Sequence, residues 1–189
     1  MIHWDHKKLV VLDRDGVINH DSDAYIRSPE EWHPIKGSLA AIAKLNRAGF
    51  RVAVATNQSG IGRGFYDLAT LGAMHDKMKT LLTAEGGQVD VIEYCPHLPT
   101  DACRCRKPAT GMLEAIARKC RVTPEEMLFI GDSKSDWRAA QNFGCEFILV
   151  LTGKGEHTLE QIETRALPPI FGNLQEIADS AGDYLASQA

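Results

Sequence analysis

The sequence predicts an α/β protein with a mainly parallel sheet, and three observations support this fold class. Short apolar runs such as Leu9–Leu12 and Met127–Ile130 alternate with segments whose apolar residues recur at helical spacing. Glycine and small polar residues follow the runs, as is typical where strands turn toward helices. Because no repeat, low-complexity tract or linker interrupts this order, we expect residues 1–189 to form one domain.

In the first half of the chain, two strands are expected to alternate with two helices. Leu9–Leu12 consists of four consecutive apolar residues, which is typical of a strand buried on both faces. The polar, turn-rich stretch 20–34 is expected to form a loop or small flap beside the end of this strand. The elements expected next are a helix over residues 38–48 closed by a left-handed Gly49, a strand over 51–55, a glycine-rich turn at 60–64 and a helix over 68–82.

The second half continues the alternation and ends on a helix. We expect, in order, a strand over 89–94, a proline-containing loop, a helix over 112–120, a strand over 127–130, a helix over 133–142, a strand over 147–151, a short strand near Ile170 and a helix over 174–185. Thr123-Pro124-Glu125-Glu126 has the cap, the first-turn proline and the acidic residues of a helix start. Gly153-Lys154-Gly155 is expected to form a loop.

Composition argues against several classes of partner. The chain has 21 Lys and Arg against 25 Asp and Glu, and its net charge of -4 disfavours broad nucleic-acid binding. No apolar run approaches the roughly 20 residues that a membrane-spanning helix needs. The opening MIHWDHKK lacks the apolar segment of a signal peptide. We therefore expect a cytoplasmic monomer that acts on a small molecule.

Polar side chains follow the predicted strands at their carboxyl ends. The first strand is followed by Asp13 and Asp15, and later strands are followed by Thr56, by Asp132 and, after a loop, by Arg106 and Lys107. Parallel strands bring these ends to one edge of the sheet. Each residue alone could be a turn hydroxyl, a surface charge or a helix cap. Together, the carboxylates, the hydroxyl and the lysine predict a phosphoryl-transfer site.

The chemistry of this site follows from its groups. Asp13 can attack a phosphate monoester in line and form an aspartyl phosphate. Asp15 can protonate the leaving oxygen and then activate the hydrolytic water. Mg²⁺ prefers oxygen ligands, which suits Asp13, Asp132 and the main-chain carbonyl of Asp15. Thr56 and Lys107 would hold the phosphoryl oxygens, where charge develops in the transition state.

Further residues are expected to orient the metal ligands or to recognise substrate. Asp136 is expected to orient the Mg²⁺ ligands rather than to bind the ion itself. Arg106 can bind bidentately to a part of the substrate that does not react, such as a second phosphate or a sugar hydroxyl. Additional contacts are expected from Asp21, Tyr25, Asn57, Gln58 and Ser59, and contacts from Arg63, Ser133 and Lys154 are left open.

A second group of residues has the composition of a metal site. Cys95, His97, Cys103 and Cys105 supply three thiolates and an imidazole, enough for a tetrahedral Zn²⁺ site with no open position. The odd total of five cysteines favours metal over disulfides in a cytoplasmic chain. A saturated site indicates a structural role, in which zinc orders the loop at about 95–105 and holds Arg106 and Lys107 at the edge of the sheet.

The order of motifs DRDGV, TNQSG, RKP and GDSKSD resembles the motif series of the haloacid dehalogenase superfamily of phosphatases, over about residues 9–151. The resemblance implies a three-layer sandwich with a Rossmann-like sheet, a zinc-binding loop and no large cap domain. Within the superfamily, LDRDGVIN, ATNQSGIGRG and the cysteine loop are most similar to the family acting on D-glycero-D-manno-heptose 1,7-bisphosphate. That family removes the C7 phosphate, which leaves heptose 1-phosphate in the synthesis of ADP-heptose for lipopolysaccharide.

Two alternatives remain at this point. Histidinol-phosphate phosphatases share the loop pattern, and their substrate needs a carboxylate near its ammonium group. A bisphosphate needs a second cationic contact instead, and Arg63, Arg106 and Lys154 favour it. A remoter alternative is a catalytically silent binding module organised by zinc. The presence of both Asp13 and Asp15 argues against that alternative.

Overall fold

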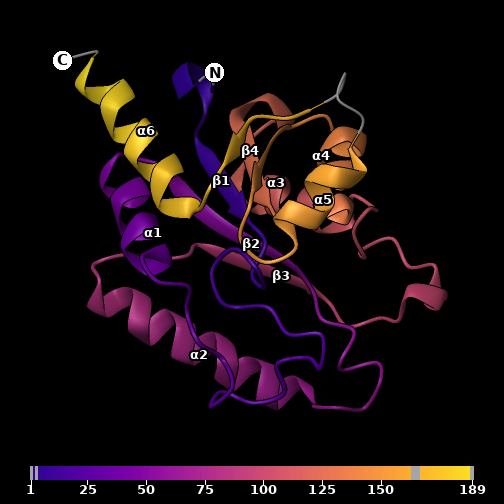
Figure 1. Cartoon of the computed structure of the whole chain (residues 1–189). Coiled ribbons are helices and arrows are strands. Elements are labelled where there is room, and N and C mark those ends of the chain that lie inside the picture. The colour runs from indigo at the N-terminus through magenta and orange to yellow at the C-terminus, as the bar shows by residue number, and fades with distance from the viewer. Residues whose placement is uncertain (1, 3, 163–166, 188–189) are drawn as a thin grey trace.

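The structure is a computed structural model, which describes residue 2, residues 4–162 and residues 167–187. Six strands form one sheet in the order β3-β2-β1-β4-β5-β6 (Figure 1). Every pairing between neighbouring strands is parallel, so the predicted parallel sheet is confirmed. The strands are β1 (Leu9–Leu12), β2 (Arg51–Asn57), β3 (Val91–Cys95), β4 (Met127–Gly131), β5 (Glu146–Val150) and β6 (Ile170–Phe171).

The sheet reverses its direction of growth at β1. Strands β2 and β3 extend the sheet on one side, and the chain then returns to place β4 on the other side of β1. Leu9 accordingly pairs with Arg51 on one side and with Met127 on the other. In open parallel sheets, ligands bind outside the carboxyl ends of the strands at such a reversal. Asp13 follows β1 directly and therefore lies at this point.

Helices cover both faces of the sheet, which confirms the predicted three-layer sandwich (Figure 1). Helices α1 (Ser38–Arg47), α2 (Leu68–Ala84) and α6 (Leu174–Ala186) lie on one face, and α3 (Gly111–Cys120), α4 (Lys134–Phe143) and α5 (Gly155–Gln161) on the other. Val10 and Leu12 of β1 belong to the first core, whereas Leu9 and Val11 belong to the second. Burial on both faces explains the continuous apolar run of this strand.

The expected helix start at Thr123 is present, with Thr123 as the cap and Pro124 in the first turn, but the helix is short. Residues Pro124–Glu126 form only a 3-10 helix, in which the Glu126 carboxylate accepts a hydrogen bond from the Thr123 N–H at 3.0 Å. Strand β4 begins directly afterwards at Met127, so no α-helix can follow. Strand β2 also runs beyond its expected end, because Thr56 and Asn57 still pair with β3.

Helix α5 was not expected from the sequence. Its seven residues, GEHTLEQ, contain one large apolar side chain, Leu159, so no helical periodicity identifies it.

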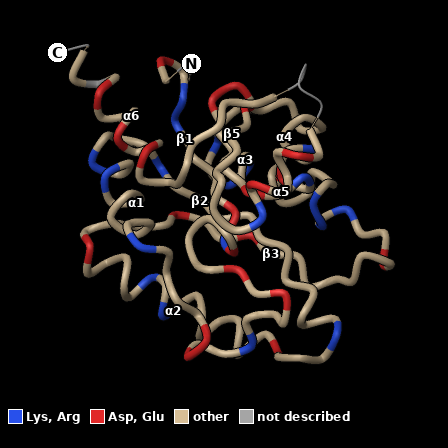
Figure 2. The backbone as a smooth tube through the Cα atoms, in the orientation of Figure 1, with Lys and Arg blue, Asp and Glu red and all other residues tan. Residues whose placement is uncertain are grey.

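Lys and Arg residues are spread over many elements of the structure (Figure 2). None of the described helices combines the length and the apolar character that crossing a membrane would require.

Residues 20–34, called the flap below, follow β1 without forming a helix or a β-strand element. An isolated bridge between Asn19 and Pro34 joins the two ends of the flap. Trp32, which belongs to the flap, is completely buried. The Lys77 ammonium of α2 donates hydrogen bonds to the carbonyl oxygens of Pro29 at 2.6 Å and Trp32 at 2.8 Å. These contacts fasten the flap to α2 beside the end of β1.

Candidate active site

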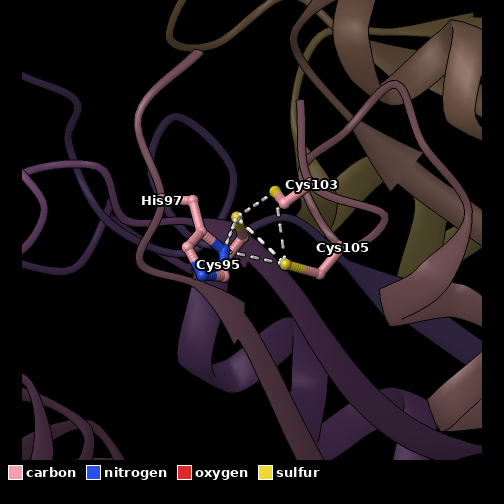
Figure 3. A group of neighbouring side chains, drawn as sticks. All are labelled: Cys95, His97, Cys103 and Cys105. Carbon is pink, nitrogen blue, oxygen red and sulfur yellow. Dashed lines mark hydrogen bonds between the residues drawn. The ribbon is translucent and has the colours of Figure 1, made fainter. Parts of the chain in front are cut away.

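Strand β3 ends in a compact cluster of sulfur and nitrogen donors (Figure 3). Cys95 is the last residue of β3, and the loop that follows supplies His97, Cys103 and Cys105. The Cys105 Sγ lies 3.3 Å from the Cys95 Sγ and 3.5 Å from the Cys103 Sγ, and the His97 Nδ1 lies 3.2 Å from the Cys105 Sγ. A tetrahedral zinc site with bonds of about 2.3 Å places its sulfurs about 3.8 Å apart, so the donors fit this ion.

The cysteine cluster directly precedes the two basic residues of the site. Arg106 follows Cys105, and its Nη1 donates to the His97 carbonyl oxygen at 3.4 Å. The five cysteines, all within the described residues, form no disulfide. The structure brings these four residues together, as the sequence predicted, and Lys107 lies two residues beyond the last of them.

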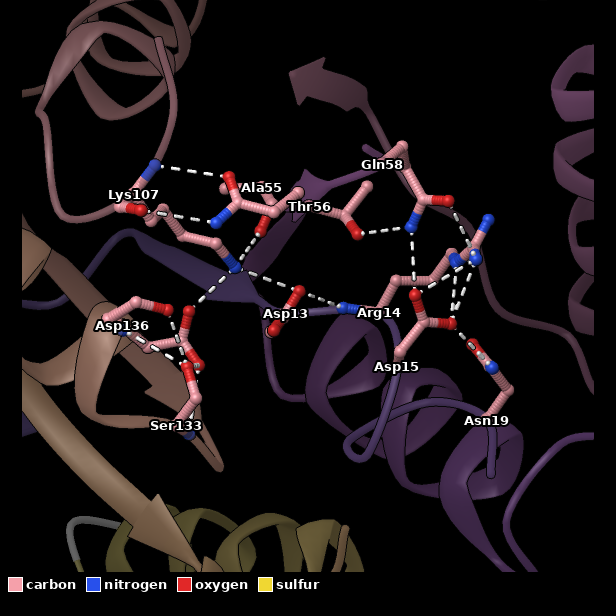
Figure 4. A network of polar contacts seen from close by, with 12 residues as sticks. Asp13, Arg14, Asp15, Asn19, Ala55, Thr56, Gln58, Lys107, Ser133 and Asp136 are labelled. Carbon is pink, nitrogen blue, oxygen red and sulfur yellow. Dashed lines mark hydrogen bonds and ion pairs between the residues drawn. The ribbon is translucent and has the colours of Figure 1, made fainter. Parts of the chain in front are cut away.

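The buried Lys107 side chain contacts three acceptors (Figure 4). Its Nζ lies 2.9 Å from the Asp13 Oδ1, 2.6 Å from the Asp136 Oδ1 and 2.7 Å from the Ala55 carbonyl oxygen. Burial opposes its charge, but the Asp13 and Asp136 carboxylates outweigh burial and raise the pKa of Lys107 above its usual value. The Asn57 side chain also accepts from the Lys107 N–H and donates to its carbonyl oxygen, which fixes the main chain there.

Three carboxylates meet at the carboxyl ends of β1 and β4. Asp13 follows β1, Asp132 follows β4 and Asp136 lies in the first turn of α4, and one oxygen from each lies within 4.8 Å of the others. The Asp136 carboxylate is held on both sides, because Oδ1 contacts Lys107 and Oδ2 accepts from the Ser133 hydroxyl at 2.6 Å. The adjacency of β1 and β4 therefore brings together the acidic residues that the sequence predicted.

This carboxylate cluster has more negative than positive charge. Three carboxylates lie together with the Lys107 ammonium group. When all three are ionised, the cluster has two more negative charges than positive ones. Burial, followed by repulsion from Asp136, raises the pKa of Asp13 to about 7 although Lys107 opposes the shift. Burial and the same repulsion raise the pKa of Asp132 well above its usual value. Hard oxygen donors with two excess negative charges fit a divalent cation such as Mg²⁺.

Two glycines allow the chain to pass close to Asp132. Gly16 has a φ of 83°, and a Cβ there would lie 2.0 Å from the Asp132 Oδ2. A Cβ at Gly153 would lie 2.1 Å from the same oxygen. The N–H of Lys154 donates to this oxygen at 2.7 Å. The loop after β5 therefore fixes the orientation of the Asp132 carboxylate.

The Asp15 carboxylate lies in a different environment from that of Asp13 (Figure 4). Its Oδ1 accepts from the Arg14 Nε at 3.0 Å and from the Asn19 Nδ2 at 2.8 Å, and its Oδ2 accepts from the Gln58 Nε2 at 2.8 Å. Burial opposes ionisation, but the Arg14 charge and these hydrogen bonds outweigh it and lower the pKa of Asp15. The Asp15 carboxylate is therefore an anion that is held apart from the metal-type cluster.

The predicted polar residues after β2 are engaged with one another. The buried Thr56 hydroxyl accepts from the Gln58 Nε2 at 2.8 Å. The Gln58 Oε1 accepts from the Arg14 Nη2 at 3.1 Å and from the Tyr66 hydroxyl at 2.6 Å. The Gln58 amide thus holds catalytic candidates in place, and a direct contact between this amide and the substrate stays a prediction.

These groups open on a cavity of about 270 Å³. Its lining includes the predicted residues Asp13, Asp15, Asp21, Tyr25, Thr56, Asn57, Gln58, Ser59, Arg106, Lys107, Asp132, Ser133 and Lys154. Asp21 of the flap lies 3.1 Å from the Lys154 Nζ. Arg63 is not among the described residues that line the cavity. Its guanidinium lies 5.7 Å from the centre of the Tyr25 ring.

Two residues of the site, Arg14 and Tyr66, were not expected from the sequence. Arg14 could have been identified from the sequence, because an arginine between two aspartates is well placed to pair with one of them. Tyr66 could not, because its contact with Gln58 depends on how the intervening loop folds back. The cavity lining also includes Ser22 and Asp23, from the loop between Asp21 and Tyr25 that was expected to contact substrate, and Ile26 and Ser135, which were not singled out.

Comparison with known proteins agrees with this geometry. The "HAD-hyrolase-like" family model matches residues 104–177. The D-glycero-beta-D-manno-heptose-1,7-bisphosphate 7-phosphatase of Pseudomonas putida is 58% identical over 154 residues, which are 82% of this chain and 88% of that protein. The protein of the same name from Pseudomonas aeruginosa is 54% identical over 177 residues, covering 92% of this chain and 97% of its own.

A solved structure supports the same assignment. The D,D-heptose 1,7-bisphosphate phosphatase of B. bronchiseptica, complexed with magnesium and phosphate, superposes with a TM-score of 0.89 at 47% identity. The match covers 96% of this chain and 99% of that one. The chain therefore belongs to the family of D-glycero-β-D-manno-heptose 1,7-bisphosphate 7-phosphatases, within the haloacid dehalogenase superfamily.

Proposed function

We propose that the chain is a Mg²⁺-dependent phosphatase that hydrolyses the 7-phosphate of D-glycero-β-D-manno-heptose 1,7-bisphosphate and leaves heptose 1-phosphate. The observation that carries the proposal is the convergence of Asp13, Asp132 and Lys107 at the sheet reversal, beside Arg106. Family membership supports the substrate, and the names of the two Pseudomonas relatives support the β anomer. The magnesium and phosphate in the related B. bronchiseptica structure support the cofactor and the reaction class.

Asp13 is the proposed nucleophile. Its Oδ1 accepts from the Arg14 N–H at 2.7 Å and lies 2.9 Å from the Lys107 Nζ, so two donors fix the carboxylate. The Asp13 Oδ2 then attacks phosphorus in line, the new bond forms an aspartyl phosphate, and the bond from phosphorus to the sugar oxygen breaks. Lys107 and the Thr56 hydroxyl hold the phosphoryl oxygens as charge develops on them.

The ligands proposed for Mg²⁺ are Asp13, Asp132 and the main-chain carbonyl of Asp15. When bound, the cation neutralises charge and so lets an anionic carboxylate approach an anionic phosphate. Asp136 is proposed to orient this site, because both of its carboxylate oxygens already contact neighbouring protein groups. Mutual repulsion among the buried carboxylates supports a requirement for the cation.

Asp15 is proposed to transfer the protons. The ionised Asp15 carboxylate of the substrate-free site takes up a proton when the phosphate dianion binds beside it, because a nearby negative charge raises the pKa of a carboxyl group. The protonated carboxyl then donates this proton to the sugar oxygen as that oxygen leaves, and the resulting carboxylate accepts a proton from the water that attacks the aspartyl phosphate. The water oxygen bonds to phosphorus and the bond from phosphorus to Asp13 breaks, which releases inorganic phosphate and regenerates both carboxyl groups. The two aspartates therefore act in sequence on one phosphoryl group.

The rest of the cavity is proposed to recognise the part of the substrate that does not react. Arg106 and Lys154 supply positive charge for the second phosphate, and Asp21, Tyr25 and Ser59 surround the sugar. Charge alone does not choose between a sugar bisphosphate and histidinol phosphate, because the lining holds cationic and carboxylate side chains. Family membership makes that choice and favours the sugar bisphosphate over histidinol phosphate.

We also propose a structural Zn²⁺ at Cys95, His97, Cys103 and Cys105, supported by the fit of their spacing to a tetrahedral site. Clustered unpaired thiols support a reducing compartment such as the cytoplasm. A monomer is supported by the small number of exposed large apolar side chains in the described part of the chain, namely Phe65, Leu68, Tyr94 and Leu167.

Parallel measurements of kcat/KM on both heptose 1,7-bisphosphate anomers and on histidinol phosphate test the proposed substrate. We expect the β anomer to give the highest value, and phosphorus NMR to show heptose 1-phosphate as the product. The Arg106→Gln variant should raise KM for the bisphosphate about 10- to 100-fold, as loss of a charged hydrogen bond does, with less effect on heptose 7-phosphate. Arg118→Gln on the exposed face of α3 is the matched control. A higher kcat/KM for histidinol phosphate would overturn the assignment.

A further inference from the structure

One glutamine lies between the proton-transfer residue and the phosphoryl-binding hydroxyl. The Gln58 Nε2 donates to the Asp15 Oδ2 and to the Thr56 Oγ1, both at 2.8 Å. The Gln58 side chain is buried, so these hydrogen bonds are shielded from solvent. A single amide group therefore sets the separation between the two residues that would touch the substrate (Figure 4).

The other end of the Gln58 amide is held by two donors. The Tyr66 hydroxyl donates to Oε1 at 2.6 Å, and the Arg14 Nη2 donates to the same oxygen at 3.1 Å. Burial raises the pKa of Tyr66 to about 12, so its phenol remains a donor at neutral pH. A flipped amide would point its NH₂ group at these donors and its oxygen at the Asp15 carboxylate. Tyr66 and Arg14 therefore select the one amide orientation that serves Asp15.

Arg14 fixes the Asp15 carboxylate from the opposite side. Its Nε and Nη2 donate to Asp15 at 3.0 and 2.9 Å, and its Nη1 contacts the Met74 Sδ at 4.0 Å. The Arg14 side chain is only 1% exposed, so the guanidinium is surrounded by protein, including Met74 of α2, and not by solvent. Gly60 completes the arrangement, because a Cβ there would lie 2.3 Å from the Tyr66 ring.

We propose that Tyr66, Gln58 and Arg14 are positioning residues that orient Asp15 for proton transfer to and from the phosphoryl group. None of the three needs to exchange a proton with the substrate. They restrict the Asp15 carboxylate to one orientation and hold it at a set distance from Thr56. This inference rests on the proposed role of Asp15 and goes beyond it. It assigns a function to Tyr66, which the sequence did not indicate, and to a glutamine otherwise expected to touch substrate.

The leaving group of the substrate provides the test. Proton donation matters for a basic leaving group and hardly at all for an acidic phenol, so a misplaced Asp15 should affect poor leaving groups selectively. We would measure kcat/KM with Mg²⁺ on a series of substituted phenyl phosphates and on an alkyl phosphate. The Tyr66→Phe variant keeps the ring packing against Gly60 and removes only the hydroxyl. Its kcat/KM should fall about 10-fold for the most basic leaving group and little for the most acidic, as a modest misplacement of a catalytic group predicts.

A double-mutant cycle distinguishes positioning from general loss of structure. In an Asp15→Asn background, measured on the most basic leaving group that this background still turns over, Tyr66→Phe should cause no further loss, although it lowers kcat/KM on that same substrate when Asp15 is present. Tyr184→Phe in α6 is the matched control, because Tyr184 lies beside Asp5, before the start of β1, and is not part of the cavity lining. It should leave the leaving-group dependence unchanged. An equal loss on all leaving groups, no loss on any, or the same loss in the Asp15→Asn background would overturn the inference.

The same series separates this inference from the proposed function. If Asp15→Asn itself does not steepen the leaving-group dependence, the proposed proton-transfer role of Asp15 is wrong and the inference fails with it. If Asp15→Asn steepens the dependence and Tyr66→Phe does not, only the positioning network is wrong. Neither result depends on which sugar the enzyme prefers, because aryl phosphates report the chemistry alone.

Discussion

The carboxylate cluster and the cysteine cluster both occupy carboxyl ends of parallel strands, yet they differ in what surrounds them. Burial raises the pKa of Asp13 to about 7 and that of the Cys95 thiol to about 12, so both of these groups disfavour a bare negative charge. In the cysteine cluster, hydrogen bonds from the Arg106 main chain and the neighbouring thiols outweigh burial and lower the pKa of Cys103 to about 7. The carboxylates open on the cavity beside Lys107. The four sulfur and nitrogen donors instead face one another and do not appear in the described lining of that cavity.

The difference indicates that the carboxylate cluster is suited to the reaction and the cysteine cluster to holding the loop beside it. An incompletely surrounded group of hard oxygen donors leaves room for a phosphate, whereas three thiolates and an imidazole complete a tetrahedral shell by themselves. The two clusters are linked through the chain, because Arg106 and Lys107 follow Cys105 directly. Disruption of the carboxylate cluster should abolish the reaction. Disruption of the cysteine cluster should displace Arg106 and Lys107, which assist the reaction.

The largest expected effect comes from Asp13→Asn. The variant loses the proposed nucleophile, so phosphate release measured with malachite green should fall by at least about 10⁴-fold. Removal of one of three mutually repelling carboxylates should leave the metal-free protein at least as stable, as judged by its melting temperature. Zinc content measured by mass spectrometry should not change.

The matched control for Asp13→Asn is Asp179→Asn, which alters an exposed aspartate that pairs with Lys44 far from the cavity. We expect it to retain wild-type turnover. Turnover of Asp13→Asn comparable with that of the wild type would contradict the role of the carboxylate cluster and would favour a silent binding module.

Disruption of the cysteine cluster should have an intermediate effect. Cys103→Ser should lower zinc content and reduce kcat/KM about 10- to 100-fold, the usual cost of losing support around a site. The loss should be greater for heptose 1,7-bisphosphate than for an aryl phosphate, because only the bisphosphate uses Arg106 as well as Lys107. Parallel kinetics on the two substrates, together with proteolysis of the loop at 95–105, provide the measurement.

Cys145→Ser is the control for this experiment, since Cys145 precedes β5 and belongs to neither cluster. It should keep its zinc and its substrate preference. If zinc-free Cys103→Ser had unchanged kinetics on both substrates, the proposed supporting role of the cluster would have to be abandoned.

The smallest expected effect is a pH dependence of stability that belongs to the carboxylate cluster. The folded, metal-free protein holds the pKa of Asp13 at about 7, above the usual 3.8 of the unfolded chain. Between these values the folded state binds a proton that the unfolded state does not. Stability should therefore fall as pH rises through this range, by about 1.4 kcal/mol per pH unit for one proton.

Mg²⁺ should replace that proton, so the increase in melting temperature on adding saturating MgCl₂ should be larger at pH 8 than at pH 5. Calorimetry of the zinc-loaded protein at both pH values provides the measurement. Asp13→Asn should show a weaker dependence on pH, because it lacks the titrating group. An equal increase at both pH values would show that protons and Mg²⁺ do not compete for this cluster.

Strands and their terminal side chains were predictable because both depend on short-range patterns. A strand buried on both faces requires a continuous apolar run, and Leu9–Leu12 shows one. Polar residues at strand ends meet wherever the sheet is parallel, which brings Asp13 and Asp132 together. The 3-10 helix at Pro124–Glu126 shows the limit of this reasoning, because a good helix start cannot extend when a buried strand begins at once.

The α/β class, the acidic and basic residues at the strand ends and the four clustered sulfur and nitrogen donors were predictable from the sequence, because each depends on residue type and spacing. Tertiary structure alone decided how Asp13 and Asp15 differ. A single residue separates them, yet Asp13 faces carboxylates and Lys107, while Asp15 faces Arg14 and Gln58. The state of a carboxylate depends on the charges and donors within a few ångströms. Lys107, Asp136 and Gln58 come from segments distant in the chain, so only the tertiary structure brings them to these two carboxylates.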